Sequence, residues 1–216
     1  MSVIESPQAA NLLSRVQNIL LKPKSEWDVI DAEPTTVQSL FLGYACVLAA
    51  IPAIAGAIGK FMPVCVLGIC VHYNPLFIVI GAVVNYVLSL AGVYGIGMVI
   101  DALAPSFGGQ KDQLKAMKVA VYSFTASWLA GIFTILPMLG LLSLVGLYSL
   151  YLLYLGLPKL MKSPQDKAMA YTAVSILCGI VVFIVVGVIA SIVMGLGVAA
   201  PGAATIGAPA TTVGVR

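Results

Sequence analysis

Six polar side chains fall within or beside long apolar stretches of the chain, where a hydrogen-bonding or ionisable group needs a partner. They are Asn85, Asp101, Ser123, Tyr148, Tyr151 and Tyr154. The tyrosines follow at three-residue steps, which places them along one slowly turning helix face. With serines and a threonine on a facing helix they could line a small polar cavity that passes a solute or relays a proton. The alternative is that these groups bond between helices and hold them together.

Two cysteines lie outside the apolar stretches, in a segment that reads almost symmetrically about Leu67 and Gly68. A two-residue turn there, with glycine where a type II turn needs it, would place Cys65 opposite Cys70. A disulfide between them could persist outside the cytoplasm, and two free thiols on a helical extension are the alternative. His72 adds a third metal-binding side chain, but the spacing matches no common zinc pattern and a fourth ligand is missing. We expect no metal and no cofactor.

The sequence is otherwise poor in groups that catalyse reactions. It has one histidine, and no pair of carboxylates falls within neighbouring apolar stretches. No glycine-rich phosphate loop follows a predicted strand. We therefore expect a protein without enzymatic activity.

The elements that position these side chains must be membrane helices. Of the 216 residues, 61% are hydrophobic and 9% are charged, whereas an average soluble domain carries about 25% charged residues. A chain of this size cannot bury so much apolar surface in a soluble core and needs lipid around it. The net charge of +3, with lysine and arginine sparse, argues against nucleic acid as a partner.

Five apolar runs are long enough to cross the ~30 Å hydrocarbon core, which takes about 20 helical residues. We expect spans at residues 39–58, 75–104, 116–136, 139–161 and 170–196. The very short join at Pro137 implies that the third and fourth spans form an antiparallel hairpin. The predicted fold class is an all-α bundle of five transmembrane helices, covering residues 39–196.

Positive charge is distributed unevenly over the loops of this arrangement. Lys60 and Arg216 fall on one side, and the other nine of the 11 lysines and arginines fall on the opposite side. Cytoplasmic loops are enriched in these residues. We therefore expect a cytoplasmic N-terminus and an external C-terminus.

The segments that flank the spans differ in pattern. Within residues 1–38, apolar side chains recur at helical spacing and a second short helix is expected around Trp27. Two interpretations remain open: an amphipathic helix in the inner membrane interface with Trp27 as its anchor, or a helix packed beneath the bundle. Residues 197–216 are mostly small and lack periodicity, which predicts a flexible external tail.

Small residues recur at four-residue steps in two of the apolar runs and allow helices to approach closely. The expected packing positions are Ala91, Gly95, Ser175, Gly179, Gly187, Ser191 and Gly195. Such faces support packing within the bundle first and self-association second.

Several short motifs occur in a defined order along the chain. They are LKPKSEWDVI at 21–30, FGG at 107–109, AVYS at 120–123, WLAGI at 128–132, LYSLYLLYLGL at 147–157 and PQDKA at 164–168. In order and spacing the chain resembles the bacterial branch of the Yip family, the Ypt/Rab-interacting membrane proteins, over about residues 20–195. The resemblance implies a five-span protein with a cytoplasmic N-terminus, here in the inner (plasma) membrane of a bacterium.

The resemblance carries less information about activity. Eukaryotic members are linked to Rab-type GTPases and vesicle traffic, but their aspartate-leucine-tyrosine-glycine-proline motif is absent from this sequence. We therefore do not expect GTPase binding to carry over.

Two functions are compatible with these observations. One is a non-enzymatic scaffold or membrane-organising protein, whose partners are membrane lipids, other membrane proteins or further copies of itself. The other is a transporter or channel for a small solute or ion. A water-accessible cavity lined by Asn85, Asp101 and the tyrosines would favour transport, and a close-packed bundle would favour the scaffold.

Overall fold

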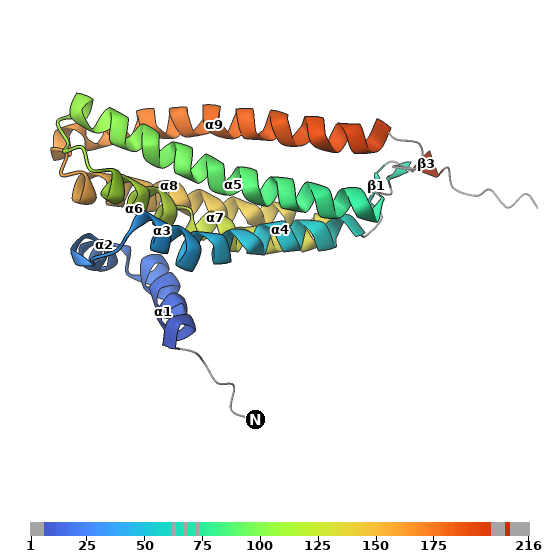
Figure 1. The fold of residues 1–216 in the computed structure, drawn as a ribbon, viewed down its shortest axis with the longest axis horizontal. Coiled ribbons are helices and arrows are strands. Elements are labelled where there is room, and N and C mark those ends of the chain that lie inside the picture. Colours follow the sequence, from blue (N-terminus) through green and yellow to red (C-terminus); the bar gives the residue numbers. More distant parts are fainter. Residues whose placement is uncertain (1–6, 62–63, 67–68, 72–73, 200–205, 208–216) are drawn as a thin grey trace, which may run out of the picture.

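The computed structural model describes residues 7–61, 64–66, 69–71, 74–199 and 206–207. A long bundle of helices runs along the longest axis, with short strands at one end and two further helices at the other (Figure 1). The helical elements of the bundle are α3 (Val37–Leu40), η1 (Phe41–Ala45), α4 (Cys46–Phe61), α5 (Pro75–Leu103), η2 (Ala104–Phe107), α6 (Gln113–Ser123), α7 (Thr125–Ala130), η3 (Gly131–Ile135), η4 (Pro137–Leu147), α8 (Tyr148–Leu160) and α9 (Gln165–Ala199).

Four helices in the described part of the chain are long and apolar enough to cross a membrane. They are Val37–Phe61, Pro75–Phe107, Gln113–Ile135 and Gln165–Ile192. Each coincides with one of the predicted spans, so the multi-pass α-helical architecture is confirmed. The predicted fourth span contains a shorter apolar helix, Leu144–Leu160, because the first half of this segment forms the 3₁₀ helix η4. The count of five therefore stays a prediction.

The helix ends follow local sequence signals. Thr36 and Ser39 form a reciprocal capping box at the start of α3, which satisfies two otherwise free backbone N–H groups. Asn74 caps α5 through its side chain, and Pro75 occupies the first helical position. After η2 the chain turns at Gly108, whose φ of 71° lies in the left-handed region that favours glycine.

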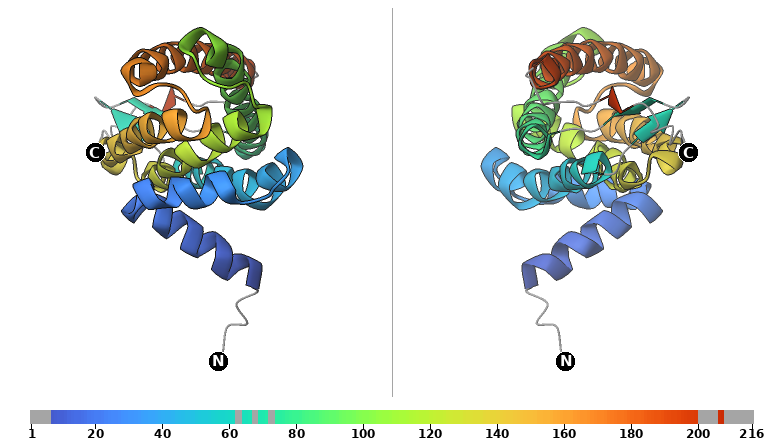
Figure 2. Two further views of the ribbon diagram at one scale, coloured as in Figure 1. Left: turned by 90° about the vertical axis from the view of Figure 1, so that its left-hand side faces the viewer. Right: turned by 90° about the vertical axis from the view of Figure 1, so that its right-hand side faces the viewer.

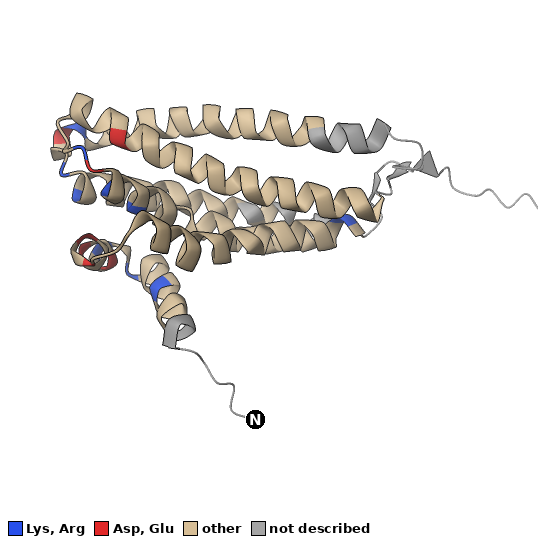
Figure 3. Cartoon of the chain, in the orientation of Figure 1, with Lys and Arg blue, Asp and Glu red and all other residues tan. Residues whose placement is uncertain are grey.

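The outer surface of the bundle is apolar, as a lipid-facing surface must be. Leu177, Val181 and Ile184 of α9 are exposed, and no charged residue occurs between Lys167 and Arg216. Charged residues instead gather at the end of the bundle where α6 and α9 begin (Figure 3). This separation of charge from apolar surface matches a bundle whose length crosses a bilayer.

α6 is the central element at the charged end. Every residue from Ala116 to Ser123 is buried, and α6 packs against both α5 and α8. The end-on views place α9 and the N-terminal helices on opposite sides of the bundle (Figure 2). α6 shares with α8 the contacts that join the N-terminal helices to the rest of the bundle.

The N-terminal region forms two helices, α1 (Pro7–Leu21) and α2 (Pro23–Ala32). α1 leads away from the bundle, while α2 crosses its charged end and packs against α8 (Figure 1). Trp27 of α2 is fully buried: its ring lies against Gly156 of α8 and meets the Tyr122 ring edge-on, with 6.4 Å between centroids. Of the two interpretations left open for Trp27, burial of its ring by protein supports packing over an anchor in the membrane interface. For α2, the packing interpretation holds.

Short strands lie at the opposite end of the bundle. β1 (Val64–Val66), β2 (Ile69–Val71) and β3 (Ile206–Gly207) form one antiparallel sheet in that order. The register pairs Cys65 with Cys70, which is the juxtaposition that a disulfide requires. The side chains of both cysteines lie outside the described ones, so the bond stays a prediction.

The first residues of the predicted flexible tail, 197–199, are helical, and a short strand follows later in the tail. α9 continues through residue 199, and β3 pairs with β2. The rest of residues 197–216 lies outside the described part of the chain.

Replacing Gly156 with alanine should loosen the docking of α2, because an added Cβ would lie 2.7 Å from the Trp27 ring. Overpacking of this kind typically costs about 1–3 kcal/mol. We expect Gly156→Ala to lower the thermal unfolding temperature in detergent. Gly187→Ala is the matched control, since nothing lies within 4 Å of that position.

The double variant Gly156→Ala, Trp27→Ala should lose less stability than the sum of the single variants, because the smaller side chain makes room for the new methyl group. Strictly additive losses would mean that the two positions are not in contact.

Candidate functional site

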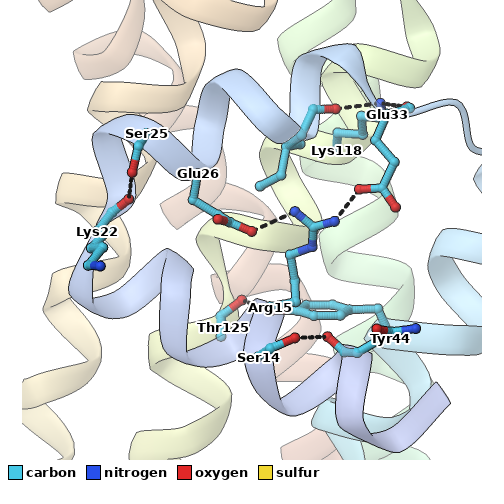
Figure 4. A network of polar contacts seen from close by, with 11 residues as sticks. Ser14, Arg15, Lys22, Ser25, Glu26, Glu33, Tyr44, Lys118 and Thr125 are labelled. Carbon is cyan, nitrogen blue, oxygen red and sulfur yellow. Dashed lines mark hydrogen bonds and ion pairs between the residues drawn. The ribbon is translucent and has the colours of Figure 1, made fainter. Parts of the chain in front are cut away.

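The most extensive polar contacts of the described chain join α1 and α2 to each other and to the bundle (Figure 4). Arg15 of α1 lies between two carboxylates of the α2 region. Its Nη1 donates to Glu26 Oε1 at 2.6 Å, and its Nη2 donates to the Glu33 carboxylate. The guanidinium carbon also lies 5.9 Å from the centroid of the Tyr122 ring, within range of a cation–π contact. Arg15 therefore connects both ends of α2 with α1 and α6.

Lys118 joins α2 to the central helix. Lys118 is buried, with only 3% of its surface exposed. Its Nζ donates to the carbonyl oxygens of Ile30 at 2.7 Å and Glu33 at 2.6 Å. These carbonyls lie at the C-terminus of α2, where backbone acceptors lack intrahelical partners and carry partial negative charge. The ammonium group thus gains two acceptors inside the protein, and the two carbonyls gain the donor that the helix itself does not supply.

Further side chains from the bundle reach α1 and α2 around this centre. The contacts are Tyr148 Oη to the Leu20 carbonyl at 3.0 Å, Lys159 Nζ to the Lys24 carbonyl at 2.5 Å and to Asp28 Oδ1 at 2.6 Å, and Lys115 Nζ to Asp31 Oδ1 at 2.7 Å. Exposed ion pairs contribute about 0–1 kcal/mol each. The buried contacts of Trp27 and Lys118 therefore dominate the docking, and we call the whole arrangement of α1, α2 and these bundle side chains the N-terminal dock.

The predicted polar cavity residues do not come together at one site, although the rings of Tyr148 and Tyr151 lie 5.4 Å apart between centroids. Tyr148 points toward α1, whereas Tyr151 and Tyr154 are exposed. A three-residue step leaves each tyrosine about 60° behind the last, because a helix has 3.6 residues per turn. Over two steps the face turns by about 120°, so the first and last tyrosines meet different surroundings.

The remaining members of that set are also dispersed. Asp101 is buried near the charged end of α5, with Oδ1 unpaired among the described residues. Asn85 is exposed on α5, although Ile78 and Gly92, at seven-residue steps on the same face, are buried. Ser123 lines a separate, mostly apolar cavity of about 640 Å³ between α5, α7, α8 and α9.

The small residues of α5 and α9 have mixed roles. Ser175 and Gly179 are buried, and a Cβ on Gly95 would lie 3.8 Å from Val182. Ala91, Gly187 and Ser191 are exposed, and among the described residues nothing lies within 4 Å of a Cβ built on Gly187. The surroundings of Gly195 lie outside the described side chains.

Arg15 and Lys118 entered the sequence-based prediction only through their positive charge, with no partner assigned to either. A signal for Lys118 existed, because it falls inside the predicted third span, where an ionisable residue marks a specific partner. Nothing local identified the acceptors, which lie 88 and 85 positions away in the chain. Within the described residues, no group of three histidine, cysteine or acidic side chains could hold a metal ion.

The bundle and α2 match a known domain, whereas Arg15 and most of α1 precede the matched residues. The family model of the Yip1 domain covers residues 18–188, from the second half of α1 into α9. The chain belongs to the Yip1 domain family. This is a family of membrane proteins and not a known enzyme family, so the apolar helices are those of an integral, multi-pass membrane protein. No curated protein and no solved structure matches the chain significantly.

Replacing Lys118 with methionine should free α2 from the bundle. The change leaves two carbonyls at the end of α2 unpaired, at a cost of about 1–3 kcal/mol. Because 1.4 kcal/mol corresponds to a factor of ten, we expect the amides of α2 to exchange about 5- to 100-fold faster with deuterium in detergent, while α9 is unchanged.

Lys115→Met is the matched control, since it removes only the partly exposed pair with Asp31. Equal acceleration in both variants would show that the Lys118 contacts are not what holds α2.

Proposed function

We propose that this Yip1-domain protein is a non-enzymatic scaffold that organises the membrane it spans, and that the N-terminal dock is the surface through which it acts. The observation that carries the proposal is that Trp27, Lys118 and Arg15 join α2 to the bundle through buried contacts. A docked platform of this kind presents the same side chains to partners at all times. Binding then needs no separate ordering step, which would weaken affinity.

The dispersion of the polar residues favours the scaffold over transport. A carrier or channel needs polar groups that surround one water-accessible path. In the part of the chain that the structure describes, Asn85, Asp101 and Tyr151 lie in separate surroundings, and the cavity beside Ser123 is lined mainly by apolar side chains. Transport remains the second candidate, supported by the position of Asn85 inside an apolar helix.

α1 is proposed to rest in the membrane interface beside the bundle. It leaves the charged end at a steep angle to the bundle axis (Figure 1). Leu13 and Leu21 are exposed on α1, while Val16 and Ile19 are buried against the bundle. Exposed leucines on a helix at the charged end of a membrane bundle suit contact with lipid at the headgroup boundary. The interfacial role thus moves from Trp27 to the outer face of α1.

We further propose five spans, with the segment Pro137–Leu160 as the fourth. The 11 residues of η4 at about 2.0 Å each and the 13 residues of α8 at about 1.5 Å each give about 42 Å. This exceeds the ~30 Å hydrocarbon core. Lys60 alone among the described lysines and arginines lies at the end opposite the dock, which supports a cytoplasmic dock, an external C-terminus and, for the bacterial branch, the inner membrane.

The scaffold proposal is tested by complementation of a strain that lacks the protein. Trp27→Ala and Lys118→Met should fail to restore the wild-type phenotype and the set of co-purified membrane proteins, because they undock α2. Asn85→Ala and Asp101→Asn should restore both. All variants must reach wild-type levels in the membrane, measured by immunoblot. The reverse pattern, with Asn85 and Asp101 essential and the dock dispensable, would establish transport instead.

The topology has its own test. A phosphatase reporter, which is active only outside the cytoplasm, should be active when fused after Arg216 and inactive when fused before Pro7. Activity at neither fusion would mean an even number of spans and would remove the five-span arrangement.

A further inference from the structure

The cavity of about 640 Å³ in the middle of the bundle has no role in the scaffold proposal. It lies between α5, α6–α7, η4–α8 and α9, and its wall is formed chiefly by leucine, isoleucine, phenylalanine and glycine. Leu144 and Leu147 of η4 and Ile184 of α9 line it and are each 60% exposed, so they form a rim that opens sideways between η4 and α9. None of the described residues that line it is charged. The cavity is therefore accessible from lipid and suits a neutral occupant.

Four serines line this wall, and they fall into two pairs. Ser127 and Ser149 are satisfied within the protein: Ser127 Oγ lies 2.8 Å from Ser149 Oγ and 3.1 Å from the Gly146 carbonyl. Ser123 and Ser175 are 2% and 1% exposed, and their hydroxyls have no partner among the described residues. Buried hydroxyls are normally hydrogen-bonded.

The unpaired state of Ser123 and Ser175 is not imposed by their helices. A serine or threonine inside a helix commonly bonds to a carbonyl in the preceding turn. Thr172, one turn before Ser175 in α9, does so with the Ala168 carbonyl at 2.8 Å. The oxygens of Ser123 and Ser175 are themselves covered, with less than 1 Å² of accessible surface each. Both residues border the cavity, so rotation about the Cα–Cβ bond would turn each hydroxyl toward an oxygen atom bound there.

We propose that the cavity binds a neutral, lipid-soluble molecule with an apolar body and a carbonyl or hydroxyl oxygen, which bonds to Ser123 and Ser175. Quinones and long-chain alcohols share this chemistry. The volume lies in the range of small-molecule sites, about 300–1,000 Å³. The proposal goes beyond the scaffold role and does not depend on it.

The depth of Ser123 and Ser175 in the membrane favours such a molecule over a phospholipid as the ligand. Ser123 and Ser175 lie ten positions beyond Gln113 and Gln165, the first residues of α6 and α9. Counted from the predicted span starts at residues 116 and 170, they lie seven and five helical positions inside the hydrocarbon core, which is about 8–11 Å from its edge at the charged end. A phospholipid offers only its acyl chain at that level, without an oxygen. A quinone or alcohol can place its oxygen there without burying a charge.

Trp128 provides a signal for binding. Its ring is buried in α7, with its centroid 6.2 Å from that of Phe124, which lines the cavity. The sequence has two tryptophans, so Trp27→Phe leaves Trp128 as the only one. Quinones quench tryptophan fluorescence at short range. A short-chain benzoquinone added to this variant in lipid nanodiscs should quench Trp128 saturably, and dodecanol should reverse the quenching if alcohols share the site.

Substitutions at the serines decide whether binding is specific. We expect Ser123→Ala and Ser175→Ala each to raise the apparent dissociation constant of the quinone about 3- to 10-fold, because each removes one hydrogen bond to the ligand. Dodecanol that fails to compete would restrict the ligand class to carbonyl compounds. Quenching that does not saturate, or that is identical in all variants, would mean simple partition into the bilayer and would overturn the proposal.

A second measurement distinguishes a ligand site from ordinary packing. In ligand-free protein, Ser123→Ala and Ser175→Ala should leave the unfolding temperature unchanged or raise it, since they remove unpaired hydroxyls. Ser149→Ala is the matched control and should lower it, because it breaks the bonds to Ser127. If all three variants are destabilised alike, Ser123 and Ser175 bond within the protein and the proposal fails.

Discussion

The ammonium group of Lys118, buried against the C-terminus of α2, is the contact on which the rest of the charged end depends. A buried cation without partners is costly, and so are the free carbonyls at a buried helix end. Each is satisfied only when α2 lies across α6 with Lys118 pointing at Ile30 and Glu33. That placement brings Trp27 over Gly156 and leaves Arg15 between two carboxylates. One polar requirement thereby positions an apolar contact and an ion-pair network.

The two ends of the bundle are held together by different forces. At the charged end, buried aromatic and aliphatic side chains combine with hydrogen bonds between distant parts of the chain, such as Tyr44 with Thr125 at 2.8 Å. Toward the other end, α9 exposes most of its side chains and shares little more than apolar contact with α5. Lipid supplies no hydrophobic drive for helices to associate. The packing of α9 therefore becomes looser away from the dock, whereas α4 and η3 stay in close contact there. The cavity beside Ser175 lies where α9 begins to loosen.

Properties that depend on local composition could be predicted from the sequence. Four spans follow from apolar runs of sufficient length, and the pairing of Cys65 with Cys70 in the strand register follows from a short symmetrical segment around a glycine. The form of the fourth run could not be predicted, because an apolar run without periodicity fits α and 3₁₀ geometry equally well. The burial of Trp27 by protein could not be predicted either, because a tryptophan on an amphipathic helix has the same sequence pattern whether membrane or protein covers it.

The failure of the predicted polar set has a more general cause. Spacing along a helix tells which side chains share a face, but it does not tell which neighbour that face meets. Tyr148 shares its helix with Tyr151 and yet bonds to the end of α1, whereas Ser123 and Ser175, which no periodic pattern links, come to line one cavity because α6 and α9 enter the bundle from the same end. Ten positions into each helix, the two serines reach a similar depth. In this bundle, entry from a common end thus brings together two residues that no helix face links, because neighbouring helices that start at one end present residues of similar depth to each other.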